Sequence, residues 1–163
     1  MTSYEFQIKD FILHKKYVLE SGSILIDYLL KNNEEDLAFN LLKNLSKHDD
    51  SKLNEDEFKK LCEIPYNTNS FTNSKEKMDE KLKKCIELHW KNNRHHPEYW
   101  DNVLNMSELD IMEMCCDWHA RSKQYNTDFL EFVKTRQNTR FHFPKKIFDK
   151  IWNYCLILEN KTL

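Results

Sequence analysis

Apolar residues recur along this chain every three or four positions, with polar and charged residues between them. Leu37, Leu41 and Leu45 are one such set. Residues three and four apart are neighbours on one face of an α-helix, so this spacing indicates amphipathic helices. Residues 65–73 are polar and turn-rich, and we expect them to form the main loop. Helices are predicted over residues 4–19, 24–30, 36–47 and 54–62, from 74 to about 92, from 107 onward, and over 127–137 and 144–159.

Local signals mark where several of these helices begin and end. Gly22 or Ser23 is expected to interrupt the first apolar stretch, because glycine is a poor helix former. Ser107 is followed three residues later by Asp110, which resembles a capping box. Pro144 suits the first turn of the last helix, where its missing N–H has no helical partner to lose.

The composition narrows the fold class. Of the 163 residues, 40% are hydrophobic and 13% aromatic, which suits one domain with one core. The chain has a single glycine, whereas hairpin turns, dinucleotide-binding loops and P-loops need several. A Rossmann domain, a P-loop ATPase and a turn-rich β-barrel are therefore disfavoured. We expect an all-α, single-domain helical bundle of about six to eight helices across residues 1–163.

The net charge and the cysteine content limit which binding partners and which cellular compartment we expect. Lys and Arg total 25 against 27 Asp and Glu, a net charge of −2, which gives no general attraction for duplex nucleic acid or an anionic membrane. The five cysteines are an odd number without a C-x-x-C pair, unlike a disulfide framework or a zinc ribbon. Residues 1–10 lack the apolar run of a signal peptide, and no stretch approaches a membrane span. We therefore expect a cytoplasmic protein, in the host cytoplasm if its source is viral, without a membrane partner.

The candidate chemistry lies in the histidines and their acidic neighbours. His48-Asp49 places an imidazole beside a carboxylate, and this ligand pair suits Mn, Fe, Co, Ni or Zn. His14 and His89 lie on apolar helix faces and are expected to point inward, where a histidine is often a core residue bonded to a carbonyl group. His95-His96 follow a predicted helix end, so a surface loop explains them equally well.

Three acidic residues share one predicted helix face. Asp110, Glu113 and Asp117 are spaced three and four apart. Asp117 belongs to an otherwise largely apolar run at 114–118, and burying a carboxylate without a partner is costly. The face is therefore either solvated or turned toward a metal ion, and the pattern leaves both alternatives open.

Together these features resemble the HD superfamily of metal-dependent phosphohydrolases. Members of that family carry a His on an early helix, a His-Asp pair, and a distant Asp on a later helix. His14, His48-Asp49 and Asp117 stand in that order here. The run HDDSK at 48–52 is similar to the H-D-x-G-K form, with Ser51 in place of glycine. The run HHPE at 95–98 is similar to segments of two-metal members such as cyclic-dinucleotide phosphodiesterases, but it lacks their glycine-rich continuation.

A closer resemblance is to a small family of uncharacterised bacterial and phage proteins, known only as a domain of unknown function. Its members carry H-x-x-x-V, H-D-x-S-K-F, H-x-x-x-N-x-H-H-x-E-Y-W and E-M-x-x-D-W. This chain reads HKKYV from His14, HDDSKL from His48, HWKNNRHHPEYW from His89 and EMCCDW from Glu113. The match covers about residues 11–120, and the helices at about 125–160 lie beyond it.

The resemblance implies a metal site and roles for its neighbours. The first divalent metal ion would be bound by His14, His48, Asp49 and Asp117. A second would be bound by His89 with one or both of His95 and His96. Lys52 would contact a phosphate oxygen or orient the site. Glu113 would orient a ligand histidine or transfer a proton.

Other side chains near these motifs are candidates for holding the substrate. An arginine suits bidentate phosphate binding, and Arg94, beside His95, is the best placed of four candidates. The other three are Arg121, Arg136 and Arg140. The rings near the motifs either stack on a base or form core: Trp90, Tyr99, Trp100 and Trp118.

The expected function is metal-dependent hydrolysis of a phosphate ester, in a nucleotide or a related small molecule, with one or two divalent ions. Whether the substrate is a monoester or a diester stays open. The alternative is a non-catalytic, metal-containing helical module that binds a nucleotide or a protein. A third reading is a helical domain without metal, which requires the clustering of the histidines to be coincidental.

Overall fold

The computed structural model describes residues 1–63 and 80–160, with the exception of the Lys81 side chain. Seven α-helices and four shorter helical turns make up these residues, and no strand occurs among them, which confirms the all-α prediction. The α-helices are α1 (Ser3–Lys31), α2 (Glu35–Ser46), α3 (Glu55–Cys62), α4 (Glu80–Asn92), α5 (Glu108–Tyr125), α6 (Phe129–Arg136) and α7 (Lys145–Leu158). The shorter turns are η1 (Asp50–Leu53), η2 (Pro97–Tyr99), η3 (Val103–Asn105) and the π-helical η4 (Gln137–Phe141).

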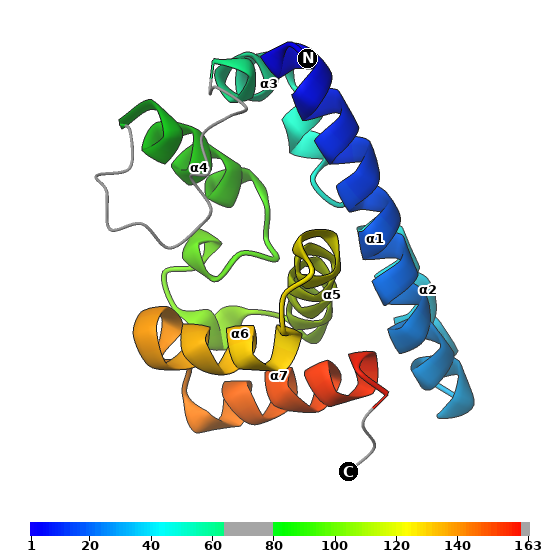
Figure 1. Ribbon diagram of the computed structural model, residues 1–163. Coiled ribbons are helices and arrows are strands. Elements are labelled where there is room, and N and C mark those ends of the chain that lie inside the picture. Colours follow the sequence, from blue (N-terminus) through cyan, green and yellow to red (C-terminus); the bar gives the residue numbers. More distant parts are fainter. Residues whose placement is uncertain (64–79, 161–163) are drawn as a thin grey trace.

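Helix α5 is the centre of the molecule. It packs against α1, α2, α6 and α7, while α3 and α4 lie together toward the N-terminal end of α1 (Figure 1). Every residue from 110 to 120 is buried, whichever side of the helix it lies on. A helix surrounded on all sides has no solvated face. The acidic residues of this stretch therefore point into the protein.

Helix α1 is continuous, so the predicted interruption at Gly22 or Ser23 is wrong. Gly22 is buried where α2 crosses, and a Cβ atom on it would lie 2.1 Å from Cδ1 of Leu45. A glycine inside a helix costs about 1 kcal/mol relative to alanine. Here the missing side chain lets α2 approach α1 closely, so the glycine serves packing rather than a turn.

Most predicted helix ends lie within a residue or two of the observed ones. Ser107 and Asp110 form the capping box: Asp110 N donates to Ser107 Oγ at 3.2 Å, and Ser107 N donates to an Asp110 carboxylate oxygen at 3.0 Å. Asn54 is the N-cap residue of α3, but its side chain makes no capping bond. Pro144 stands one residue before the first turn of α7, at the N-cap. The predicted loop at 65–73 and the predicted start of the fourth helix lie outside the described residues.

The five cysteines are free thiols, and all but Cys62 are buried. Among the described residues, no helix combines the length and the apolar character that crossing a bilayer requires.

Candidate metal centre

Seven side chains that are far apart in the sequence meet between α1, α4 and α5. They come from the middle of α1, the turn after α2, the last turn of α4, the loop after α4, and the middle of α5. Three groups of possible metal-ligand atoms occur among the described residues, and within each group the atoms lie within 4.8 Å of one another. The first group is His14, His48 and Asp117, and the second is Asp49, His89, His95 and His96. The third, His48, His95 and Glu113, takes one histidine from each of the other two.

The turn after α2 points two adjacent side chains into the same site. Asp49 has φ 58°, in the left-handed region, which costs roughly 1–2 kcal/mol for most residues but less for Asp. Lys15 on α1 holds this turn, because its Nζ donates to His48 O and to Asp50 Oδ1, each at 2.7 Å. The backbone reversal therefore lets both His48 and Asp49 face inward.

In the first group, the Nε2 atoms of two histidines converge on a carboxylate. His14 Nε2 lies 2.9 Å from Asp117 Oδ1 and 3.3 Å from His48 Nε2. Ligand atoms on one metal ion with bonds of about 2.1 Å are about 3.0–3.4 Å apart at octahedral or tetrahedral angles. These two separations are close to that range, and the third, from His48 Nε2 to Asp117 Oδ1, is longer, at 3.8 Å. Asp49 lies beside this group, with Oδ1 3.6 Å from His48 Nε2 and Oδ2 3.9 Å from His14 Nε2.

The second group contains buried polar atoms that lack a hydrogen bond. Asp49 Oδ1 lies 3.2 Å from His89 Nε2 and 3.5 Å from His95 Nε2. Asp49 Oδ1, His95 Nε2 and His96 Nε2 are buried, and none makes a well-formed hydrogen bond. Leaving a buried polar atom unpaired costs about 1–3 kcal/mol, and such atoms call for an explanation such as a bound ion.

Two glutamates fix how the histidine rings are turned. Glu113 Oε1 accepts from Nδ1 of His48 at 3.0 Å and from Nδ1 of His95 at 3.2 Å. Glu57 Oε1 accepts from Nδ1 of His89 at 2.8 Å. A carboxylate at Nδ1 places the proton there and leaves the lone pair on Nε2, as metal-bound histidines require.

The pKa directions of the two carboxylates and of His14 favour cation binding, whereas those of His48 and His89 do not. Burial would lower the pKa of His48 and of His89, but Asp49 outweighs it and raises both, so a cation bound there would replace a proton. Burial alone would raise the pKa of Asp49, but His48 and Lys52 outweigh it and hold that pKa well below the usual range. Burial is likewise outweighed at Glu113, where hydrogen bonds from His48 and His95 lower the pKa to about 2. Burial, helped by the Arg121 charge, lowers the pKa of His14 to about 4. At neutral pH the site therefore offers ionised carboxylates and, at His14, a neutral imidazole.

Lys52 contacts the site, whereas Arg94 does not. Lys52 Nζ donates to Asp49 Oδ2 at 2.6 Å. Arg94 is ion-paired with Asp110 at 3.2 Å at the start of α5, and its guanidinium stacks on Trp100 at 4.6 Å. The Arg94 side chain is 56% exposed. Its predicted substrate contact is therefore not supported by any contact with the seven clustered residues.

The acidic face of α5 divides between two roles. Glu113 and Asp117 turn into the site, as the metal alternative required, while Asp110 caps the helix and binds Arg94. Trp118 is a core residue that stacks on Phe141 with ring centres 5.5 Å apart.

A family model described as a family of unknown function (DUF5662) matches residues 3–153. The chain belongs to the DUF5662 family. No curated protein and no solved structure matches the chain. Membership confirms the predicted kinship with an uncharacterised family, and the match reaches well past the motif region into α7. Because DUF5662 has no assigned activity, the function of this member has to be argued from its own residues.

Glu57 is the part of this DUF5662 site that sequence reasoning missed. It stands in an acidic first turn, Glu55-Asp56-Glu57, which looks like ordinary charge stabilisation at a helix start. In the fold it is 1% exposed, and its other oxygen accepts from Asn92 Nδ2 at 3.1 Å. No spacing within α3 signals this role, because both partners are on α4.

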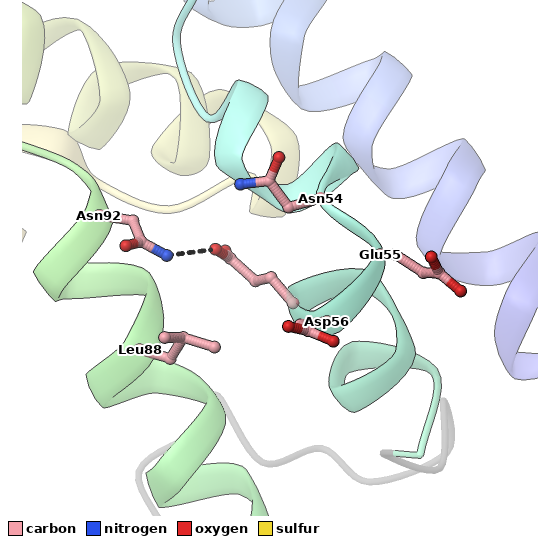
Figure 2. Close-up of a pocket in the computed structure, with 6 residues that line it drawn as sticks. Asn54, Glu55, Asp56, Leu88 and Asn92 are labelled. Atoms are coloured by element: carbon pink, nitrogen blue, oxygen red, sulfur yellow. Dashed lines mark hydrogen bonds between the residues drawn. The ribbon is translucent and has the colours of Figure 1, made fainter.

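A pocket of about 390 Å³ lies beside this glutamate, between α3 and α4 (Figure 2). It is lined mainly by polar side chains, and the hydrogen bond between Asn92 and Glu57 crosses it. Glu57 lines the pocket and bonds Nδ1 of His89, and none of the seven clustered residues is part of the lining. We therefore place the chemistry at the histidine cluster, where the unpaired donor atoms are. The lining residues are Asn54, Glu55, Asp56, Glu57, Leu88 and Asn92.

Proposed function

We propose that this DUF5662 protein is an HD-type metal-dependent phosphohydrolase that acts on a phosphate ester of a nucleotide or a related small molecule. The observation that carries the proposal is the convergence of His14, the His48-Asp49 pair and Asp117. These residues come from α1, the turn after α2 and α5, in the order that the HD resemblance requires.

The residues present fit a divalent metal ion. The first group offers two imidazoles and a carboxylate, with Asp49 beside them, and the second offers Asp49 and three imidazoles. Mixed nitrogen and oxygen ligands suit Mn, Fe, Co, Ni or Zn. The first two groups, with Asp49 a member of the second and beside the first, support two ions. A metal ion bound here would lower the pKa of a water molecule and neutralise charge on a phosphoryl group.

The protein's own residues would orient and charge the site. Lys52 keeps 15% of its side chain exposed and so can reach a phosphate oxygen while it holds Asp49. Glu113 touches two ligand histidines, which favours an orienting role over the proton transfer that the sequence left open. We therefore treat Glu113 as a positioning residue and Lys52 as the substrate-contacting one.

One observation favours the alternative, a non-catalytic metal module. The side chains of His14, His48, Asp49 and His95 are at most 3% exposed, which also suits a closed structural site. The two functions differ at Lys52. In an enzyme, Lys52→Ala lowers turnover while metal content stays unchanged, because Lys52 is not a ligand. If the site is structural, the protein hydrolyses no phosphate ester, whichever metal it is loaded with.

The deciding experiment is the metal content per chain, measured by elemental mass spectrometry on untagged protein purified without chelators. We expect one or two equivalents of a transition metal, lost in the His48→Ala/Asp49→Ala double variant. His142→Asn is the control, since it removes an exposed histidine at φ 47°, a conformation that Asn tolerates. A screen of phosphomonoesters and phosphodiesters with that metal follows. Absence of bound metal after loading with Mn or Fe(II), or metal without any hydrolysis, would contradict the proposal.

A further inference from the structure

A second pair of charged residues lies one helical turn from the metal centre. Helices α1 and α5 pack against each other, and His14 of α1 meets Asp117 of α5 at 2.9 Å. Four residues before His14 stands Asp10, and four residues after Asp117 stands Arg121. Residues four apart lie on the same helix face. Asp10 and Arg121 therefore meet as well, at 3.2 Å, beside the first ligand group.

Asp10 and Gln124 hold the Arg121 guanidinium through one of its nitrogens, and Tyr125 is a further hydrogen-bond partner. Arg121 Nη1 donates to both carboxylate oxygens of Asp10, at 3.2 and 3.4 Å, and to Gln124 Oε1 at 2.9 Å. Asp10 and Gln124 leave Nε and Nη2 unused. A guanidinium carries five N–H donors in a planar fork that matches phosphate oxygens.

Asp10 has a second donor that remains if Arg121 turns away. Gln124 Nε2 donates to Asp10 Oδ1 at 2.6 Å. The carboxylate would keep this bond after losing the guanidinium, so Asp10 would still have a hydrogen-bond donor if Arg121 bound another anion. Asp10 thus behaves as an internal anion that occupies Arg121 in the absence of a ligand.

Solvent reaches this side of the site. The side chains of Arg121, Asp10 and Lys52 are 27%, 19% and 15% exposed. Those of His14 and His48 are at most 1% exposed. An anion arriving from solvent can therefore meet Lys52 and Arg121 before it reaches the buried ligands.

The charges of this region act on one another. Burial would raise the pKa of Asp10, but Arg121, Gln124 and Lys52 outweigh it and lower that pKa. Burial would lower the pKa of Arg121, but Asp10 and the more distant Asp117 and Asp49 raise it. Arg121 is thus a cation close to the metal-site carboxylates, and Lys52 contacts one of them, Asp49.

We propose that Arg121 is a substrate-binding residue that leaves Asp10 to bind a phosphate oxygen, on the side of the site where Lys52 stands. This inference rests on the proposed phosphohydrolase function. It places the phosphate contact on Arg121 instead of Arg94, whose guanidinium is bound to Asp110 and Trp100 away from the cluster.

The test uses the metal-loaded protein and inorganic phosphate as the probe, with affinity measured by isothermal titration calorimetry. Arg121→Gln is expected to weaken phosphate binding about tenfold or more, the size of a lost charge-assisted contact. Asp10→Asn is expected to tighten it, because the competing anion is gone. Arg121→Lys should recover part of the affinity. Lys145→Gln, which removes one charge from an exposed ion pair on α7, is the control.

Metal content and melting temperature are measured on every variant, so that a folding defect or a lost metal ion is recognised. If Arg121→Gln does not fold, the tighter phosphate binding expected of Asp10→Asn still tests the proposal. Equal phosphate affinity in wild type, Arg121→Gln and Asp10→Asn, with metal bound, would overturn the role of Arg121 alone. So would a loss in Arg94→Gln that Arg121→Gln does not show. Wild-type protein that binds no metal would overturn the proposed function and this inference together.

Discussion

Glu113 Oε1 lies within hydrogen-bonding distance of Nδ1 of both His48 and His95, at 3.0 and 3.2 Å, so one carboxylate orients histidines from two different segments. The contact joins α5 to the turn after α2 and to the loop after α4. One histidine of the first group and one of the second therefore depend on the same carboxylate, which forms the third group with them.

Because Glu113 orients both histidines, we expect Glu113→Gln to lose metal affinity. The amide can accept from one ring but cannot hold both as the ionised carboxylate does, so both histidines lose orientation. Loss of such a partner typically lowers metal affinity about 10–100-fold. Competition with a chromophoric chelator measures the change. Glu131→Gln, an exposed substitution on α6, is the control, and equal affinity in the two variants would show that Glu113 does not position the ligands.

Removal of the Glu57 carboxylate is expected to weaken metal binding in the second group only. It contacts Nδ1 of His89, and neither His14 nor His48 is among its partners. If wild type binds two ions, Glu57→Ala should retain one and release or weaken the other. Elemental analysis after dialysis gives the stoichiometry. Retention of both ions at wild-type affinity would contradict the orienting role of Glu57.

Metal removal should lower the melting temperature. The site brings Asp49, Glu113 and Asp117 together in a buried volume, and a cation bound only by the folded state stabilises it. At a free metal concentration about 100 times the Kd, the gain of about 2.7 kcal/mol corresponds to a rise of roughly 5–10 °C for a chain of this size. Differential scanning calorimetry with and without chelator measures it. The His48→Ala/Asp49→Ala variant should show no chelator-dependent shift.

Gly22→Ala should destabilise the fold although alanine is the better helix former. The new Cβ would lie 2.1 Å from Leu45 Cδ1, and overpacking costs about 1–3 kcal/mol, against about 1 kcal/mol gained in propensity. Urea unfolding measures the net loss. Ser23→Ala, at the next and exposed position, should be near neutral. Pairing Gly22→Ala with Leu45→Val should recover stability, and full additivity of the two changes would mean that the clash is absent.

Local sequence signals predicted most of the helices because helix ends are decided by neighbouring residues. The Ser107–Asp110 capping box and the stripe of leucines in α2 each involve residues three or four apart. Gly22 was misjudged for the opposite reason. Its partner, Leu45, is on another helix, and no local pattern reveals that α2 needs the space.

The sequence by itself determined the inventory of the site: it supplied the histidines and aspartates, their order, and the amphipathic helices that carry them. Only the tertiary structure decided that residues 110–120 of α5 are buried on every side and which way each ring is turned. It also decided that Glu57 and the Asp10–Arg121 pair belong beside the cluster. Helical periodicity specifies a face but not what packs on it. The partners of Glu57 and of Asp10 are on other helices, and the packing of those helices brings them together.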